Sequence, residues 1–153
     1  SMRNEELMAI QEKYNQGVQK LALLRTCLES VSSAAGLAVA EVRVDDIRGV
    51  MKFYFAGNEY YVRIRITDRD VDDVGGEYRV PVGWLDWGRC SDTGALEPVE
   101  QSNYYDDRGI LCELEKEEFY CDFSSCDDDR VQRGLVLKLS KLVGRSIAIN
   151  NTR

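Results

Sequence analysis

The sequence predicts an α+β domain in which a long N-terminal helix, an antiparallel meander of about five strands and a C-terminal helix follow one another. Helical periodicity is confined to residues 4–33 and 125–145, whereas residues 37–123 alternate between apolar and polar side chains. The 153 residues are 44% hydrophobic, which is enough for one core. We therefore expect residues 1–153 to form a single domain.

The N-terminal helix is predicted from a heptad-like apolar seam. Asn4 is the expected N-cap, and Gly36 fits the end of the helix. The seam comprises Leu7, Ile10, Tyr14, Gly17, Leu21, Leu24, Leu28 and Val31. So long a seam indicates a homo-oligomer formed through this helix. The alternative is that the whole seam covers the protein's own sheet.

A β-hairpin is predicted between Gly49 and Thr67. Gly57-Asn58 is a two-residue turn signal, and this loop would place Ala56 opposite Glu59. One face then carries Met51, Phe53, Phe55, Tyr60, Val62 and Ile64, and the other carries Lys52, Tyr54, Tyr61, Arg63 and Arg65. This register sets Lys52 opposite Arg63, a like-charge pair that an anion would relieve.

The remaining strands are predicted at residues 37–44, 77–87, 108–115 and 118–123, with an acidic loop at 68–76 and an irregular segment at 87–107. In the first strand Ala38, Ala40, Val42 and Val44 would share one face. In the second, Tyr78, Val80, Val82 and Trp84 would do so, and Pro81 indicates a sheet edge.

The C-terminal helix is predicted over residues 125–145. Ser125 with Asp128 resembles a capping box, and Gly144 is the expected start of the helix end. The buried stripe comprises Val131, Leu135, Leu139, Leu142 and Val143. Residues 147–153 are expected to be loose or to add a short strand.

No cofactor and no metal site are expected. Cys121 and Cys126 have a poor spacing for a metal, and the chain has no histidine. The aspartates at 68, 70, 72 and 73 resemble a calcium loop, but Asp73 replaces the required glycine and Arg79 the final glutamate. The odd count of five cysteines, with a charged N-terminal stretch, predicts reduced thiols and a cytoplasmic protein.

The polar face of the hairpin is the candidate ligand-binding site. Guanidinium groups bind phosphate or carboxylate, and aromatic rings can stack on a base. Trp87 is preferred to Trp84 because alternation would place Trp84 in the core. The site residues are Lys52, Tyr54, Tyr61, Arg63, Arg65 and Trp87. The alternative is an ordinary solvated sheet face whose cations pair with nearby acids.

The function predicted from these features is non-catalytic capture of an anionic, nucleotide-like small molecule. Histidine and the common catalytic motifs are missing, so the protein is not expected to be an enzyme. The net charge of −7 argues against general nucleic-acid binding, and the sequence contains no membrane span. The alternative function is a protein-interaction module, such as an inhibitor, immunity protein or chaperone-like adaptor, acting through acidic loops and an exposed helix stripe.

Overall fold

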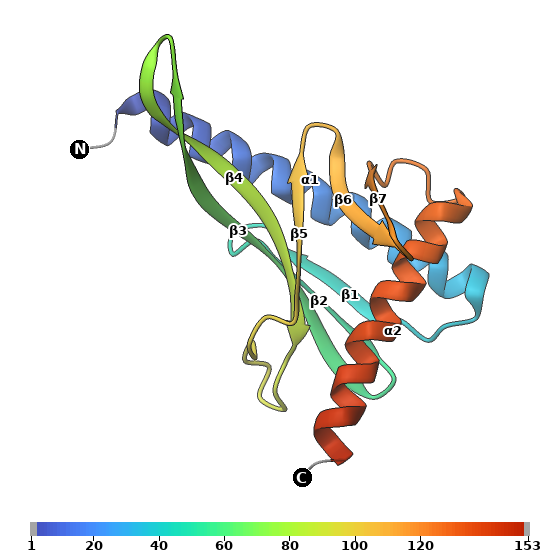
Figure 1. Cartoon of the computed structure of the whole chain (residues 1–153). Helices are drawn as coiled ribbons and strands as arrows, with labels where there is room; N and C mark the ends of the chain where they lie inside the picture. Colours follow the sequence, from blue (N-terminus) through green and yellow to red (C-terminus); the bar gives the residue numbers. More distant parts are fainter. Residues whose placement is uncertain (1–2, 152–153) are drawn as a thin grey trace.

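The fold is α+β, with two helices flanking a seven-stranded antiparallel meander (Figure 1). The computed structural model describes residues 3–151, and side chains as far as residue 144. The elements are α1 (Asn4–Ala35), β1 (Ala40–Asp45), β2 (Val50–Phe55), β3 (Asn58–Asp73), β4 (Gly76–Arg89), β5 (Gln101–Asp106), β6 (Gly109–Leu114), β7 (Glu117–Cys121) and α2 (Asp129–Asn151). The fold class is as predicted, but the sheet has seven strands rather than five.

Helix α1 uses the C-terminal two thirds of its apolar seam for the protein's own core. Leu21, Leu24 and Leu28 are fully buried, whereas Leu7 is 53% exposed. The helix ends at Gly36, whose φ of 66° places it in the left-handed region. Its N-cap is Arg3, which makes no side-chain capping bond, so the prediction of Asn4 as the cap is wrong.

The β2–β3 hairpin turns at Ala56-Gly57, one residue earlier than predicted. Both residues have positive φ, 50° and 80°, as a tight two-residue hairpin turn requires. Phe55 therefore pairs with Asn58, and Lys52 lies opposite Tyr61 rather than Arg63. The pairing differs from the predicted one by two residues, so every side chain keeps its predicted face.

The residues predicted as an acidic loop form instead the end of a long two-stranded arm. Pairing between β3 and β4 continues to Asp73 and Gly76, which leaves only a short turn. Because β2 and β5 do not reach this far, residues 67–82 project from the sheet, as the upper left of Figure 1 shows. Pro81 lies in this part of β4, where β3 is its only neighbour, in agreement with the predicted edge position.

Three further features of the fold, a strand, a bulge and a helix cap, differ from the prediction. Strand β5 lies inside the segment predicted to be irregular. A bulge in β1 turns Ala40 to the face of Tyr54, so the predicted common face of Ala38, Ala40, Val42 and Val44 is broken. Asp128 caps α2, because its side chain accepts a hydrogen bond from the backbone N–H of Arg130 at 2.8 Å. Ser125 contributes only its backbone carbonyl, which accepts a hydrogen bond from the N–H of Asp128.

Helix α2 continues beyond its predicted end. It passes through Gly144 to Asn151, so the predicted loose tail from Ile147 is helical as far as the description extends. The last two residues of that predicted tail, Thr152 and Arg153, lie outside the described residues, as does the side chain of Arg145. Neither helix of the described chain is long and apolar enough to cross a membrane.

Both helices pack against the same face of the sheet. Alternate strand residues turn toward them, and the core includes Leu21, Leu24, Leu28, Phe53, Val62, Leu85, Trp87, Tyr105, Ile110, Leu135 and Leu139. Tyr105 also donates a hydrogen bond from its hydroxyl to the carbonyl of Lys13, at 2.6 Å, which fixes α1 across the sheet. We call the opposite side of the sheet the outer face; its strand residues point away from α1 and α2.

Candidate anion-binding site on the outer sheet face

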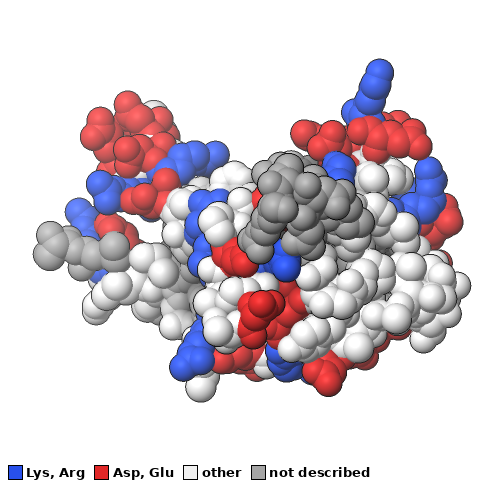
Figure 2. Space-filling view, turned by 90° about the horizontal axis from the view of Figure 1, so that it is seen from below, with Lys and Arg blue, Asp and Glu red and all other residues white. Residues whose placement is uncertain are grey.

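The outer face carries the polar side chains of the hairpin, together with those of β4 and β5. Pairing places Lys52 beside Tyr61 and Gly88, and Arg63 beside Asp86. In the view of Figure 2, acidic side chains gather on two projections and also lie among Lys and Arg side chains over the body between them.

Two of the predicted site residues, Arg63 and Arg65, are held by a buried carboxylate. Arg65 donates two hydrogen bonds to Asp86, at 2.7 and 3.1 Å, and Arg63 lies 3.6 Å from the same group. Ser102 donates a third hydrogen bond at 2.7 Å. Burial alone would raise the pKa of Asp86, but the hydrogen bonds from Arg65 and Ser102 and the two positive charges hold it below its usual value. Asp86 therefore compensates one of the three positive charges predicted for this face and holds both arginines in place.

The segment between β4 and β5, residues 90–100, folds over part of the outer face. It returns to the sheet through a bridge between Cys90 and Leu96 and a 2.9 Å bond from the Glu97 N–H to the Arg89 carbonyl. Tyr61 lies fully buried beneath it and donates its hydroxyl hydrogen to the Glu97 carbonyl at 2.6 Å. Tyr61 is therefore covered by the protein's own chain, and it is not part of the candidate site described below.

The same segment and strands β1 and β2 enclose a pocket of about 530 Å³. Lys52 lies in its wall and donates to the carbonyl of Gly94 at 2.7 Å. Arg43 and Lys52 are direct cross-strand partners, a like-charge pair that costs stability unless negative charge lies near it. The lining residues are Arg43, Val44, Asp45, Arg48, Val50, Lys52, Gly94, Ala95 and Leu96. We call this hollow the Lys52 pocket.

The Lys52 pocket has more positive than negative charge. The nearly buried Glu59 forms an ion pair with Arg43. Arg48 reaches Asp45 only at 4.0 Å, and its side chain is 84% exposed. An ammonium group carries three donors, of which the Gly94 carbonyl takes one, so Lys52 retains bonding capacity. The pocket is therefore equipped to accept an anion.

Arg43 and Arg48 are absent from the predicted site, although a signal for one of them was present. Arg43 stands between Val42 and Val44, so alternation places it on the polar face, and its neighbour across the ladder is Lys52. Arg48 belongs to the β1–β2 turn and carries no periodic signal. Tyr54, a predicted residue, is 39% exposed, with the Arg43 guanidinium 5.5 Å from its ring centre.

The two tryptophans have exchanged their predicted places. Trp87 is 2% exposed and packs in the core, with the Lys138 ammonium 5.4 Å from its ring centre. Trp84 lies on the outer face as the direct partner of Arg65. The physical reason is the β3–β4 register, which turns Leu85 and Trp87 inward with Ile64 and Val62. Trp87 is therefore not part of the candidate site.

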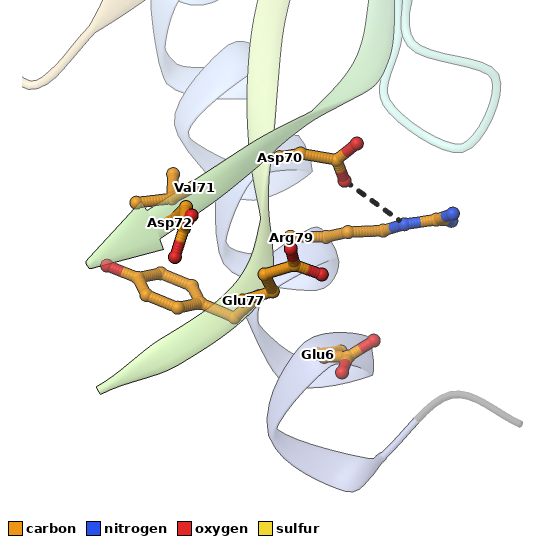
Figure 3. A pocket seen from close by; sticks show the side chains of 7 residues that line it. Glu6, Asp70, Val71, Asp72, Glu77 and Arg79 are labelled. Atoms are coloured by element: carbon orange, nitrogen blue, oxygen red, sulfur yellow. Dashed lines mark ion pairs between the residues drawn. The ribbon is translucent and has the colours of Figure 1, made fainter. Parts of the chain in front are cut away.

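A second hollow, of about 740 Å³, lies between the first turns of α1 and the arm (Figure 3). Glu6, Asp70, Asp72 and Glu77 line it with Val71, Tyr78 and Arg79. Arg79 is already paired with Asp68 at 3.1 Å and Asp70 at 3.6 Å. Its acidic lining disfavours an anion.

The four aspartates that resemble a calcium loop in the sequence all lie on the extended strand β3. The described residues contain no group of three or more His, Cys, Asp or Glu side chains placed to hold a metal. The five cysteines are free thiols, and Cys27 is fully buried, with its sulfur 3.2 Å from the Phe123 carbonyl.

Comparison of the chain with protein-family models, with curated proteins and with solved structures finds no significant match.

Proposed function

We propose that the protein binds an anionic small molecule in the Lys52 pocket. The observation that carries the proposal is that three cations, Arg43, Arg48 and Lys52, line one hollow in a chain whose net charge is −7. A surplus of acids elsewhere repels anions from most of the surface. A local cationic pocket on such a body favours a compact anion over an extended nucleic acid.

The contacts available in the pocket suit phosphate or carboxylate oxygens. Lys52 is oriented by its bond to the Gly94 carbonyl, and Arg48 has freedom to turn toward a ligand. Charge-assisted hydrogen bonds from such groups are stronger than neutral ones. Val50, Ala95 and Leu96 add apolar contact area. The pocket thus combines the two ingredients of a small-molecule site, apolar walls and a few convergent polar groups.

Isothermal titration calorimetry with inorganic pyrophosphate tests this proposal. Lys52→Gln should weaken binding about tenfold or more, because a hydrogen bond to a charged group contributes about 1.5–3 kcal/mol. The matched control is Lys116→Gln, which makes the same change of charge at the exposed β6–β7 turn. Arg63→Gln should have a smaller effect, since Asp86 holds that side chain. Equal affinities for the wild type and Lys52→Gln, or no binding at all, would count against the proposal.

A second candidate function is protein–protein contact through the arm and the first turns of α1, including the self-association expected of the N-terminal helix. The observation in its favour is that Met8, 62% exposed, and Leu7, 53% exposed, belong to the first turns of α1, whose Glu6 lines the same hollow as Tyr78 of the arm. Light scattering should detect an assembly that Met8→Ser with Leu7→Ser dissociates. Ile47→Ser, an exposed apolar position at the β1–β2 turn, is the control. A monomer at high micromolar concentration would exclude self-association.

A further inference from the structure

Three aromatic side chains that the proposed function leaves unused form a row on the outer face. The rings of Trp84 and Tyr104 meet edge to face, with centroids 5.8 Å apart, and Tyr104 meets Tyr120 in the same way at 6.5 Å. All three side chains are half-buried, and they stand on β4, β5 and β7. Because α1 and α2 pack against the other face, the described helices leave this row uncovered.

The aromatic row adjoins the Lys52 pocket through the two arginines. Val50 lines the pocket and pairs with Arg63, and the next outward residue along β3 is Arg65, which pairs with Trp84. Neighbouring strands lie ~4.8 Å apart, and residues two apart on one strand ~6.8 Å, so Trp84 is about 12 Å from the pocket wall. A single ligand can therefore contact both the pocket and the row.

The charges are unevenly distributed along this track. At the aromatic end two arginines contact buried carboxylates: Arg65 contacts Asp86, which it shares with Arg63, and Arg108 contacts Asp106. At the pocket end the cations outnumber the carboxylates. A single-stranded nucleic acid needs cations along the whole line of stacked bases. The separation of charge from rings fits a molecule with one anionic end and one planar end.

We infer that the ligand is a nucleoside polyphosphate, with its phosphates in the Lys52 pocket and its base against Trp84 and Tyr104. This inference rests on the proposed function, because the pocket has to bind the phosphates. Aromatic faces and arginine planes both stack on nucleobases, and Arg65 lies 5.2 Å from the Trp84 ring centre. The base would add to this existing stack.

Calorimetry at fixed ionic strength tests the inference with two kinds of probe: the four ribonucleoside triphosphates and inorganic tripolyphosphate, which has no base. We expect at least one nucleotide to bind ten times or more tighter than tripolyphosphate. Tyr104→Leu should remove most of that advantage and leave the affinity for tripolyphosphate unchanged, whereas Tyr104→Phe should keep it. Tyr78→Leu, on the same face of β4 but in the arm, is the matched control and should change neither affinity.

The outcomes separate the two proposals. Equal affinities of nucleotides and tripolyphosphate for the wild type would overturn the base contact and leave the pocket standing. Failure of every probe to bind would overturn the proposed function itself. Tighter binding of a ten-nucleotide single strand than of any mononucleotide would overturn the choice of ligand. Circular dichroism checks the fold of each variant, and Trp84→Leu, at the other proposed base contact, replaces Tyr104→Leu if the latter does not fold.

Discussion

Replacing Asp86 with asparagine should destabilise the fold and at the same time strengthen anion binding. Asp86 is fully buried and accepts hydrogen bonds from Arg65 and Ser102, while Arg63 adds a further charge at 3.6 Å. The neutral amide keeps the shape of the side chain, but its NH₂ group would face guanidinium donors. Two arginines would then lose their carboxylate.

The magnitude follows from the exposure of the partners. Breaking a buried ion pair costs about 3–5 kcal/mol when the remaining charge stays buried. Here the arginine side chains are 36% and 39% exposed, so water recovers part of the loss. We expect a decrease of about 2–3 kcal/mol in the free energy of unfolding, or roughly 5–10 °C in Tm for a chain of this length.

The pH dependence has a definite sign. The pKa of Asp86 is lower in the folded protein than its ordinary value of 3.8. Its stabilisation is therefore complete above pH ~4 and is lost as the pH falls through the folded pKa. Asp86→Asn should remove this part of the acid-induced loss of stability. Asp70→Asn, at an exposed pair in the arm, is the control and should change stability by no more than about 0.5 kcal/mol.

Urea unfolding followed by circular dichroism measures the stability, and pyrophosphate calorimetry measures the binding. A charge removed ~10 Å from the ligand in a water-like dielectric changes binding by ~0.4 kcal/mol, so affinity should rise about twofold. A loss of stability below about 0.5 kcal/mol would refute the assigned role of Asp86. A fall in anion affinity would show that the arginines serve binding only when Asp86 orients them.

Three further predictions concern the core, a buried lysine and the helix seam. Gly83→Ala would drive a methyl group into the ring of the fully buried Tyr105 and should lower the free energy of unfolding in urea by more than about 2 kcal/mol. Gly144→Ala, in open space on α2, should instead raise it by about 0.5–1 kcal/mol. Similar effects at both sites would contradict the packing. Burial lowers the pKa of Lys138 to about 8, so above that pH the unfolded chain holds a proton that the folded protein has released. Relative to Lys138→Met, stability should therefore rise by up to ~3 kcal/mol between pH ~8 and the ordinary lysine pKa of 10.5; parallel stability profiles would contradict this. Leu21→Asp, at a fully buried position, should unfold the chain rather than only dissociate an assembly. Circular dichroism and light scattering measure the two effects. A variant that is folded and monomeric would show that Leu21 belongs to an interface instead.

The faces of the β2–β3 hairpin could be predicted from the sequence, but its register could not. Strand side chains repeat every two residues, so a turn at Ala56-Gly57 or at Gly57-Asn58 gives the same inward set. Both choices contain a glycine suited to positive φ, and only the packed structure distinguishes them. The choice of turn decides whether Lys52 pairs across the hairpin with Tyr61, as observed, or with Arg63.

The strand pairing at the end of the arm and strand β5 could not be predicted, because the composition of these segments is unusual for strands. Aspartate is depleted in strands, so residues 68–73 resemble a loop. Their pairing is supported across the arm by Arg79, which contacts Asp68 and Asp70. Strand β5 has the sequence QSNYYD, in which apolar alternation is missing because Asn103 also points inward. Local periodicity contains no signal for the β3 half of the arm or for β5.

The candidate site depends on contacts between distant parts of the chain. Lys52 binds the carbonyl of Gly94, 42 residues away, and residues 90–100 bury Tyr61. No spacing within the sequence indicates that this segment folds back over the sheet. The exchange of Trp84 and Trp87 likewise follows from the register of β4 against β3. Of the cations in the candidate site, alternation in the sequence could indicate Lys52 and Arg43, but not Arg48 or the segment that covers the sheet.

A two-dimensional amide NMR titration with pyrophosphate tests the central claim most directly, because it locates the bound anion. The Lys52 pocket predicts that the largest shift changes fall on Arg48, Lys52, Gly94, Ala95 and Leu96, and that Lys52→Gln suppresses them. The amides of the acidic arm, such as Asp72 and Glu77, should not move. Shift changes centred elsewhere on the chain, or none at millimolar pyrophosphate, would contradict an anion site in this pocket.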